Sequence, residues 1–497
     1  MNNIVDFLNL PVKFKDDFCL CSDSQKTYTY NEFMEKALLL ANEIMEKKLK
    51  NQPIGVMASH KADTLVEFAA VILSGNYYVS VSDETVDSVF EKIKEQIHMA
   101  YFIDELPSNI KNSNETELEK LEEISRKLDC WRNDIGKDSP LYVVFTSGST
   151  GIPKGILKSH GNVIDFIEAY QKEFAFDKNT VLGNQAPFYF DASSKDIYTM
   201  LYTKCKMHIF DASLFMKPIE LVQCLNEKKV TVIQWVPSAL SILSALGTFK
   251  TIKPKYLEKV MFVGEKFAVP QLLKWMDELP DVDFVNLYGS SEMAGICAFC
   301  HLNRNDVEQN QRIPIGKPLS NSEVFLIDSD GNRIIRGEGE LVVSSRALAS
   351  EYINMPELTK KVFVQRKEGY CYYSGDMAFY DDDGRIIFAG RRDHQIKHMG
   401  HRIELEEIET VALNINYVKD ACCIYHKNKI ILFYCGDIDK AELTTELKKS
   451  LAEYMIPNKI VLTDKIPLNA NGKKDRIKLQ NKMERERRNG RNKRNNS

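Results

Sequence analysis

Between residue 31 and about residue 287, apolar residues follow two alternating patterns. Helical spacing is found at residues 31–47, 63–73, 218–229 and 270–278. Short apolar runs typical of buried strands follow these segments, at residues 53–57, 77–81, 230–236 and 282–287. The alternation predicts α/β layers with largely parallel sheets.

The pattern changes near residue 322. Asp-Gly turns at Gly331 and Gly384 join strand-like runs and predict two β-hairpins. A second, small domain is expected to begin after residue 390. Its helices are predicted at residues 404–413 and 440–454, and its strands at residues 418–425 and 430–435.

The end of the chain has a different composition. Residues 478–497 hold eight basic and two acidic side chains and almost nothing apolar. Such a segment binds polyanions in some proteins and is merely solvated in others, and we interpret it as a disordered tail.

Length and charge narrow the class of protein. A chain of 497 residues exceeds the size of one hydrophobic core, so at least two domains are expected. The net charge of −4 predicts no general attraction to nucleic acid or membranes. No run reaches the roughly 20 apolar residues of a membrane-spanning helix. Because the N-terminus lacks a basic stretch followed by an apolar core, we expect a cytoplasmic protein.

The eleven cysteines are scattered, and their number is odd. Without a secretory signal, a disulfide framework is not expected. Cys297 and Cys300, followed by His301, have the spacing of a haem-attachment site. Residues 295–299 are better interpreted as a buried strand with structural thiols.

The loop after the apolar run 141–145 is the most informative local sequence. Its glycines let backbone N–H groups approach an anion, its hydroxyls donate hydrogen bonds, and its lysine adds a positive charge. Pro153 stands directly before the lysine, where a Walker A motif has glycine, so a nucleotide enzyme of another class is predicted. The phosphate-binding candidates are Thr146, Ser147, Gly148, Ser149, Thr150, Gly151 and Lys154.

Three further clusters follow in order. Residues 286–292 come after an apolar strand, at the end where open α/β sheets bind ligands. There, Tyr288 is suited to stack on a base and Glu292 to bind Mg²⁺. Asp376 follows a tight turn and is suited to accept hydrogen bonds from ribose, and Lys473 lies in a glycine-bearing turn near the C-terminus. Each cluster alone is weak evidence, and their co-occurrence is what indicates function.

Together these motifs resemble those of the adenylate-forming superfamily, from Thr27 to Arg476. The similarity is greatest to amino-acid-activating adenylation domains of nonribosomal peptide synthetases and to stand-alone D-alanine–carrier-protein ligases. The deciding segments are Phe190-Asp-Ala-Ser193 and residues 390–404 and 467–473. The resemblance implies an α/β (α+β) fold. A large N-terminal domain of layered sheets with a small β-barrel part would span residues 1–390. A mobile α+β lid would span residues 391–477, and the tail residues 478–497.

The resemblance also implies roles for single residues. It places Asn286, Tyr288, Gly289 and Ser291 at the nucleotide, with Arg391 assisting Asp376 at the ribose. Lys473 would bridge the substrate carboxylate and the α-phosphate, with Lys154 and Glu292 also catalytic and Glu292 holding Mg²⁺. Charge repulsion between carboxylate and phosphate makes such cations necessary. Asp393 would be the hinge of the lid, and Gly400 would lie beside the pantetheine tunnel.

The same resemblance assigns an amino-acid pocket. Asp191 would pair with the α-ammonium group of the substrate, and further pocket positions are Lys195, Gln234, Val263, Gly264, Leu287 and Gly295. A buried lysine needs a partner or loses its charge. Lys195 therefore either meets an acidic side chain, which makes glutamate or a related diacid the substrate, or extends to solvent beside a small or medium apolar amino acid.

The expected activity is ATP-dependent formation of an aminoacyl-AMP with release of pyrophosphate. Because no phosphopantetheine attachment motif follows Arg476, transfer to the phosphopantetheine of a separate carrier protein is expected. The expected protein is a monomer that binds neither nucleic acid nor membranes. The alternatives are an acyl- or aryl-CoA ligase and a non-catalytic binding protein of the same fold. Ser290 and Asn469 depart from the family's usual proline and threonine, and neither change removes a catalytic group.

Overall fold

The computed structural model describes residues 3–8, 17–113, 116–146, 153–310, 312–392, 395–468 and 474–484. The chain divides into two compact units. The large unit comprises Met1–Asp83, Lys94–Phe145 and Gly155–Arg392, and the small unit comprises Glu84–Ile93, Thr146–Lys154 and Asp393–Ser497. None of the described helices is long and apolar enough to cross a membrane.

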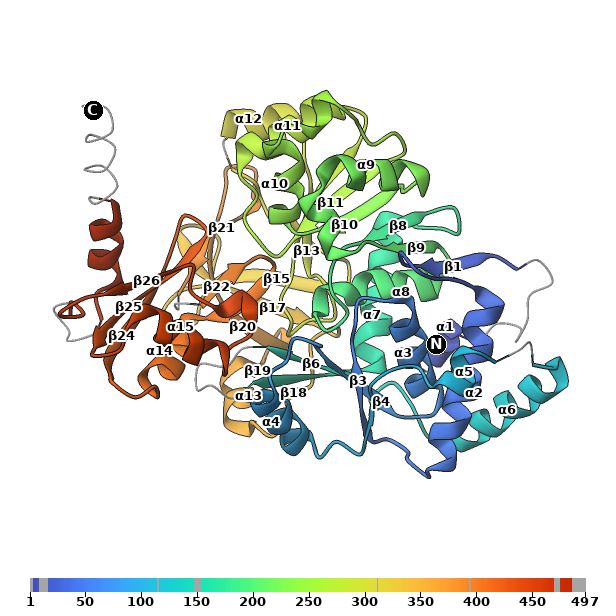
Figure 1. The fold of residues 1–497 in the computed structure, drawn as a ribbon. Coiled ribbons are helices and arrows are strands. Elements are labelled where there is room, and N and C mark those ends of the chain that lie inside the picture. Colours follow the sequence, from blue (N-terminus) through green and yellow to red (C-terminus); the bar gives the residue numbers. More distant parts are fainter. Residues whose placement is uncertain are drawn as a thin grey trace. The chain divides into compact units, whose positions relative to one another are not determined.

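The first sheet of the large unit is mostly parallel, with antiparallel strands at its edges (Figure 1). Its strands, in spatial order, are β14 (Lys317–Pro318), β13 (Ala298–His301), β12 (Asp283–Tyr288), β11 (Lys259–Val263), β10 (Val232–Trp235), β8 (Val181–Asn184), β9 (Lys206–Ile209), β1 (Cys19–Ser22) and β2 (Thr27–Thr29). The strands predicted at residues 230–236 and 282–287 are its members β10 and β12.

The second sheet contains the strands on both sides of the predicted phosphate loop. In spatial order they are β18 (Glu351–Tyr352), β7 (Lys154–Ser159), β6 (Pro140–Thr146), β4 (Tyr77–Val81), β3 (Pro53–Met57) and β5 (Tyr101–Ile103). Strands β6, β4, β3 and β5 are parallel to their neighbours in this group. The prediction of largely parallel sheets is therefore confirmed.

Helices cover both faces of the first sheet. In β11, Val260 and Phe262 pack into one core cluster, and Met261 and Val263 pack into the other. Successive strand residues point to opposite faces, which explains this alternation. The cluster with Val260 and Phe262 also contains residues of α9 (Pro218–Glu227), α10 (Pro237–Ala245) and α11 (Val269–Glu278). These three helices lie together near β10 and β11 in Figure 1.

The opposite face of the first sheet meets α7 (His160–Phe174) and α8 (Ser194–Thr203). The same cluster includes residues of the second sheet and of α2 (Tyr30–Glu46) and α3 (Ala62–Leu73), so it is the core between the two sheets. Ser159 is the N-cap residue of α7, and its hydroxyl accepts a hydrogen bond from the N–H of Asn162 in a capping box. The other helices of the large unit are α1 (Val5–Leu8), α5 (Ser108–Lys111), α6 (Leu118–Trp131), α12 (Arg304–Asn310) and α13 (Pro356–Val362), and α4 (Asp87–Ile97) belongs partly to each unit.

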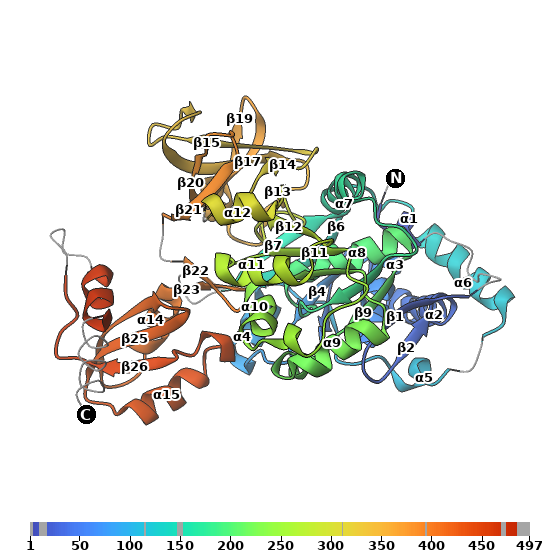
Figure 2. The ribbon, with the colours of Figure 1, turned by 90° about the horizontal axis from the view of Figure 1, so that it is seen from above.

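An antiparallel sheet forms the expected small β part of the large unit (Figure 2). Its strands are β16 (Arg333–Ile334), β15 (Ser322–Ile327), β17 (Glu338–Ser345), β20 (Gly369–Tyr380) and β19 (Phe363–Arg366), with β21 (Ile386–Arg391) paired to β20. The pairs β15–β16 and β20–β21 confirm the two predicted hairpins. Gly331 and Gly384 have φ values of 81° and 75°, a conformation that favours glycine.

The small unit is built on a sheet of β24 (Val418–His426), β25 (Lys429–Gly436) and β26 (Lys459–Leu462). Helices α14 (Leu405–Leu413) and α15 (Lys440–Lys448) share a core cluster with one face of this sheet. A hairpin of β22 (Gln395–His398) and β23 (His401–Glu404) precedes α14. Arg476 begins a further helical segment that extends to residue 484, and its Leu479 is buried against the other face of the sheet. The first residues of the predicted tail are therefore folded.

Two of the predicted elements differ from the observed ones by three residues or more at one end. The helix predicted at residues 440–454 ends at Lys448, and a 3₁₀ turn follows at Glu453–Met455. The strand predicted at residues 295–299 begins only at Ala298, because Gly295 has a φ of 106° that no strand adopts. The described residues contain no disulfide, and Cys297 is buried while Cys300 is partly exposed.

Glu409 on α14 connects the helix to the last segment of the small unit. Its buried carboxylate accepts hydrogen bonds from Arg476 Nη2 at 2.7 Å and Lys474 Nζ at 3.1 Å, and from the backbone N–H of Cys423 at 2.7 Å. Lys474 also forms a β-bridge with Leu468. The two basic residues that follow the predicted catalytic turn are thus fixed to the body of the small unit.

Replacing Glu409 with Gln is expected to destabilise the small unit by roughly 3 kcal/mol, because removing one partner of a buried ion pair leaves the other charge uncompensated. Chemical denaturation followed by circular dichroism measures the loss. The matched control is Glu442→Gln at an exposed position of α15. Equal stability of the two variants would contradict the structural importance of the Glu409 contacts.

Candidate active site

A carboxylate on strand β20 is held between an aromatic hydroxyl and a guanidinium. Asp376 is 3% exposed. It accepts hydrogen bonds from the hydroxyl of Tyr288, at the end of β12, and from Arg391 Nη1, at the end of β21, the latter at 2.5 Å. Burial and the nearby Asp376 raise the pKa of Tyr288 far above its usual value, so its hydroxyl stays protonated and donates. The sequence predicted all three residues as nucleotide contacts, and the structure brings them together.

Glu292 lies in the segment between β12 and β13 and is 1% exposed. Its Oε1 accepts a hydrogen bond of 2.6 Å from the hydroxyl of Tyr352 on β18. Among the described residues, no group of three or more His, Cys, Asp or Glu side chains is placed to hold a metal ion. Mg²⁺ commonly binds one or two carboxylates and completes its shell with water and phosphate oxygens. A buried carboxylate outside any protein cage fits that mode of binding.

The turn that carries Glu292 is packed tightly against the backbone. A Cβ atom at Gly289 would approach the carbonyl oxygen of Gly295 to 2.3 Å, and one at Gly295 would approach the ring of Phe166 to the same distance. Both glycines are therefore sterically required. Asn286 is 8% exposed and donates to the carbonyl of Pro314 at 2.8 Å, a contact that anchors the neighbouring loop.

Asp191 begins the 3₁₀ turn Asp191–Ser193 that leads into α8, and it is 7% exposed. Its Oδ1 accepts a hydrogen bond of 3.0 Å from the hydroxyl of Tyr142 and lies 3.4 Å from Lys158 Nζ. No residue of the described chain is hydrogen-bonded to its Oδ2. Burial raises the pKa of Asp191, and Lys158 and Tyr142 oppose that rise.

Lys158 is a fully buried cation that the sequence analysis missed. Its ammonium group donates to the carbonyl oxygens of Ser291 at 2.6 Å and Met293 at 2.7 Å, besides its contact with Asp191. Burial lowers its pKa, while Asp191 and Glu292 raise it. The residue thus connects the turn that carries Glu292 to the start of α8. In the sequence its only signal is a lysine directly after the apolar pair Ile156-Leu157, and the fold is needed to show that it is buried.

Gln234 and Lys195 are two further buried candidates, one on a strand of the first sheet and one on a helix. Gln234 on β10 is 3% exposed and accepts a hydrogen bond of 2.6 Å from Tyr170 on α7. Lys195 on α8 is 2% exposed and donates to the carbonyl of Ala192 at 2.6 Å. The structure thus contradicts the alternative in which Lys195 extends to solvent. Asp196, which follows it, accepts a hydrogen bond of 2.8 Å from Asn184.

The remaining pocket candidates lie near the ends of neighbouring strands. Val263 and Leu287 belong to the core cluster that faces α7 and α8. Gly264 follows β11 with a φ of 96°, which favours glycine and turns the chain at the strand end.

Three described candidates belong to the small unit: Thr146, Lys154 and Gly400. Lys154, at the start of β7, donates to Glu404 Oε1 at 2.9 Å, and Glu404 also accepts a hydrogen bond of 2.6 Å from Gln395. Gly400, with a φ of 84°, and Met399, with a φ of 51°, form the two-residue turn of the β22–β23 hairpin. Positive φ at both turn positions is the geometry of a type I′ turn.

Several candidates lie outside the described residues. They are Ser147, Gly148, Ser149, Thr150 and Gly151 of the phosphate loop, Asp393 and Lys473. Thr146, at the end of β6, is described.

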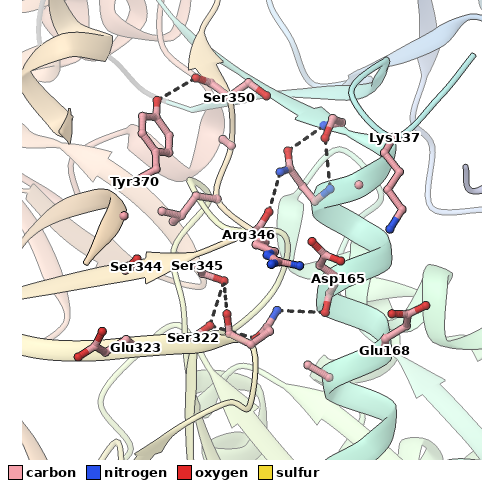
Figure 3. Close-up of a pocket in the computed structure, with 18 of the residues that line it drawn as sticks. Lys137, Asp165, Glu168, Ser322, Glu323, Ser344, Ser345, Arg346, Ser350 and Tyr370 are labelled. Atoms are coloured by element: carbon pink, nitrogen blue, oxygen red, sulfur yellow. Dashed lines mark hydrogen bonds between the residues drawn. The ribbon is translucent and has the colours of Figure 1, made fainter. Parts of the chain in front are cut away.

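A cavity of 1060 Å³ opens elsewhere in the large unit, between α7 and strands β15, β17 and β20 (Figure 3). Its lining is polar and of mixed charge, with Lys137, Asp165 and Arg346 among its residues. Tyr370 points across it and donates to the carbonyl of Ser350 at 3.1 Å. None of the described candidate residues lines this cavity, so it is distinct from the sites that they form.

Models of known protein families match both the N-terminal and the C-terminal part of the chain. The model of AMP-binding enzymes matches residues 11–353, and the model of the AMP-binding enzyme C-terminal domain matches residues 407–473. The first match covers more than half of the chain.

Curated relatives match over nearly the whole length. The D-alanine–D-alanyl carrier protein ligase of Lacticaseibacillus casei is 28% identical over 479 residues, covering 91% of this chain and 93% of the relative. Zwittermicin A synthase ZmaJ of Bacillus cereus is 30% identical over 475 residues, covering 91% and 90%.

Solved structures share the fold. The Vibrio cholerae adenylation domain AlmE, in complex with glycyl-adenosine-5'-phosphate, superposes with a TM-score of 0.80 at 20% identity and covers 94% of each chain. PA1221, a nonribosomal peptide synthetase protein containing adenylation and carrier domains, gives a TM-score of 0.81 at 21% identity and covers 97% of each chain. These matches confirm the predicted mixed α/β fold.

Proposed function

The chain belongs to the family of AMP-binding enzymes, and we propose that it activates an amino acid with ATP and loads it onto a carrier protein. In the first step, the amino acid's carboxylate attacks the α-phosphorus of ATP, and pyrophosphate leaves with the electrons of the broken P–O bond. The product is an aminoacyl-AMP. In the second step, the phosphopantetheine thiol of a separate carrier protein takes the aminoacyl group as a thioester, and AMP is released.

The observation that carries this proposal is the environment of Asp191. Its carboxylate is buried, one oxygen is oriented by Tyr142, and the other has no hydrogen-bond donor among the described residues. A carboxylate oxygen left open in this way can accept from a cationic donor on a bound ligand. The α-ammonium group of an amino acid supplies one, whereas a fatty or aryl acid does not. The curated relatives include several D-alanine–D-alanyl carrier protein ligases, which supports the same substrate class.

The nucleotide-binding roles follow from the local chemistry. Asp376 would accept hydrogen bonds from the ribose hydroxyls, with Tyr288 and Arg391 holding its carboxylate in place. The phosphate loop from Thr146 to Lys154 would bind the β- and γ-phosphates through backbone N–H groups and hydroxyls. Lys473 would neutralise charge between the attacking carboxylate and the α-phosphate.

Glu292 is the residue that would hold Mg²⁺, through the buried carboxylate that Tyr352 orients. When bound, the ion supplies positive charge to the phosphate oxygens. Asp393 would act as the hinge between residues 1–390 and the lid at residues 391–477, and Gly400 would lie beside the entering thiol.

The proposal is tested by incubating the full chain with ATP, Mg²⁺, hydroxylamine and the proteinogenic amino acids. Hydroxylamine attacks the activated carbonyl, so an aminoacyl-adenylate yields a hydroxamate and AMP, which mass spectrometry detects. We expect a hydroxamate of one or a few amino acids. Absence of any amino-acid hydroxamate would contradict the proposal.

The second candidate function is a CoA ligase. The o-succinylbenzoate CoA synthetase of Bacillus subtilis superposes with a TM-score of 0.79 at 18% identity, so the fold alone does not separate the two functions. A second incubation, with coenzyme A, aryl acids and fatty acids and without hydroxylamine, distinguishes them. Our account predicts no CoA thioester, and formation of an aryl- or fatty-acyl-CoA would favour the alternative.

Replacing Asp376 with Asn is expected to weaken ATP binding by roughly 10- to 100-fold, because a hydrogen bond to a charged group contributes about 1.5–3 kcal/mol. Titration calorimetry with ATP measures the change. Asp382→Asn, at an exposed position of the neighbouring turn, is the matched control and should bind ATP normally. Normal ATP binding by the Asp376 variant would exclude Asp376 as a ribose ligand.

A further inference from the structure

Three buried polar groups on α8 and β10 have incomplete hydrogen bonding in the described structure. The ammonium group of Lys195 can donate three hydrogen bonds and makes one, to the carbonyl of Ala192. Nε2 of Gln234 and Oδ1 of Asp196 have no partner among the described residues. Buried polar groups are almost always paired, and leaving one unpaired costs about 1–3 kcal/mol. Because several such groups occur together, we infer that a polar ligand binds to them.

These groups lie on β10 and on α8, the helix that packs against one face of the first sheet. Gln234 lies on β10, and its amide oxygen accepts from Tyr170 on α7, which leaves the amide N–H groups as donors. Lys195 and Asp196 lie in the first turn of α8, directly after the Asp191–Ser193 turn. Asp196 is hydrogen-bonded to Asn184 on β8, the strand that pairs with β10. Gln234 pairs with Met261, which belongs to the core facing α7 and α8.

Lys195 is the group that most needs a further partner. It is 2% exposed, and no carboxylate of the described chain lies within 4 Å of its nitrogen, the distance limit of an ion pair. Asp196 is held in another direction, with Oδ2 bonded to Asn184. Burial lowers the pKa of Lys195, and Asp196 and Asp191 raise it. An additional oxygen acceptor at the ammonium group would stabilise its charged form.

Resting on the proposed function, we propose that the substrate amino acid carries a side chain ending in a carboxylate or carboxamide group. The carbonyl oxygen of that group would accept from Lys195 and from the amide of Gln234. The α-ammonium group would occupy the open oxygen of Asp191. A substrate of this class completes the hydrogen bonding of both donors, which an alkyl side chain cannot do.

The charges favour the carboxylate of the two. With Glu292 assigned to Mg²⁺, the remaining buried charges are those of Lys158 and Lys195, which balance Asp191 and Asp196. The substrate's α-ammonium group adds one positive charge, and a side-chain carboxylate restores neutrality. Uncompensated charge in a buried site is costly. An acidic amino acid is therefore expected to bind better than its amide.

The test measures kcat/KM for ATP–pyrophosphate exchange with aspartate, glutamate, 2-aminoadipate, asparagine, glutamine, alanine, valine and leucine. We expect the best acidic or amide substrate to exceed alanine by roughly 100-fold or more, because sites built to hydrogen-bond a substrate reject analogues that lack the polar group. The acid-to-amide ratio identifies which of the two groups is bound. A preference for an alkyl side chain would overturn the inference and would mean that water satisfies these groups. Failure of every amino acid would instead overturn the proposed function.

A variant tests the role of Lys195 directly. Lys195→Met keeps an unbranched side chain one atom shorter and removes the charge. It is expected to lower the ratio of kcat/KM for the preferred substrate to kcat/KM for alanine by roughly 100-fold. Lys178→Met, at an exposed position, is the matched control. Unchanged ATP binding by the variant shows that it is folded. If the folded variant keeps the preference of the parent enzyme, Lys195 does not bind the side chain.

Discussion

Replacing Lys473 with Ala is expected to reduce ATP–pyrophosphate exchange by roughly 100- to 1000-fold and to leave ATP binding nearly unchanged. The attacking carboxylate and the α-phosphate are both anionic, and a cation between them acts mainly when charge spreads in the transition state. Such a residue contributes to kcat more than to ground-state binding. Lys473 itself lies outside the described residues. The residues that follow its turn are fixed by the β-bridge between Leu468 and Lys474.

The comparison uses Lys478→Ala as a matched control, because Lys478 is exposed and lies five residues further along the chain. Exchange rates at saturating amino acid give kcat, and calorimetry gives the affinity for ATP. Full exchange activity in the Lys473 variant would show that another group neutralises the α-phosphate. A parallel loss of ATP affinity would assign Lys473 to ground-state binding instead.

Asp191→Asn is expected to lower kcat/KM for the amino acid by roughly 100- to 1000-fold, equivalent to about 2.7–4 kcal/mol. The variant keeps the shape of the side chain and removes the charge that pairs with the substrate's ammonium group. It also leaves Lys158 without its buried counter-ion. The affinity for ATP should be retained, because Asp191 contacts Tyr142 and Lys158 and not the nucleotide-binding candidate Asp376.

Two additional variants separate substrate binding from stability. Asp83→Asn changes an exposed carboxylate and should behave like the parent enzyme. The double variant Asp191→Asn with Lys158→Met removes both buried charges, so stability should recover while amino-acid activation stays low. Recovery of activation in the double variant would show that Asp191 acts only as the partner of Lys158.

Much of the fold could be predicted because buried apolar residues recur with the period of the helix or strand that carries them. The strand at Tyr77–Val81 and the helix at Tyr30–Glu46 follow directly from this periodicity. The hairpin of β22 and β23 could not be found this way, since Gln395, His398 and Glu404 are among its buried residues. The overlong helix at residues 440–454 has a related cause. Leu447, Leu451 and Met455 are buried at helical spacing, although a 3₁₀ turn replaces the end of the helix.

The candidate site also contains residues that the sequence predicted and residues that only the fold revealed. Asp376, Tyr288 and Arg391 are distant in sequence, and motif order alone indicated that they act together. Lys158 and Tyr142 carry no motif, and only the fold places them against Asp191. Sequence left the environment of Lys195 open, because whether a lysine is buried depends on how α8 packs against the first sheet. Tertiary packing, which no local pattern encodes, supplied these contacts.

The central claim is that the chain activates amino acids rather than other carboxylic acids. It is tested most directly by ATP–pyrophosphate exchange with the parent protein, run in parallel with amino acids, with aryl acids and with fatty acids. Our account predicts exchange with at least one amino acid and none above background with the other acids. Exchange that requires an aryl or fatty acid and occurs with no amino acid would contradict it.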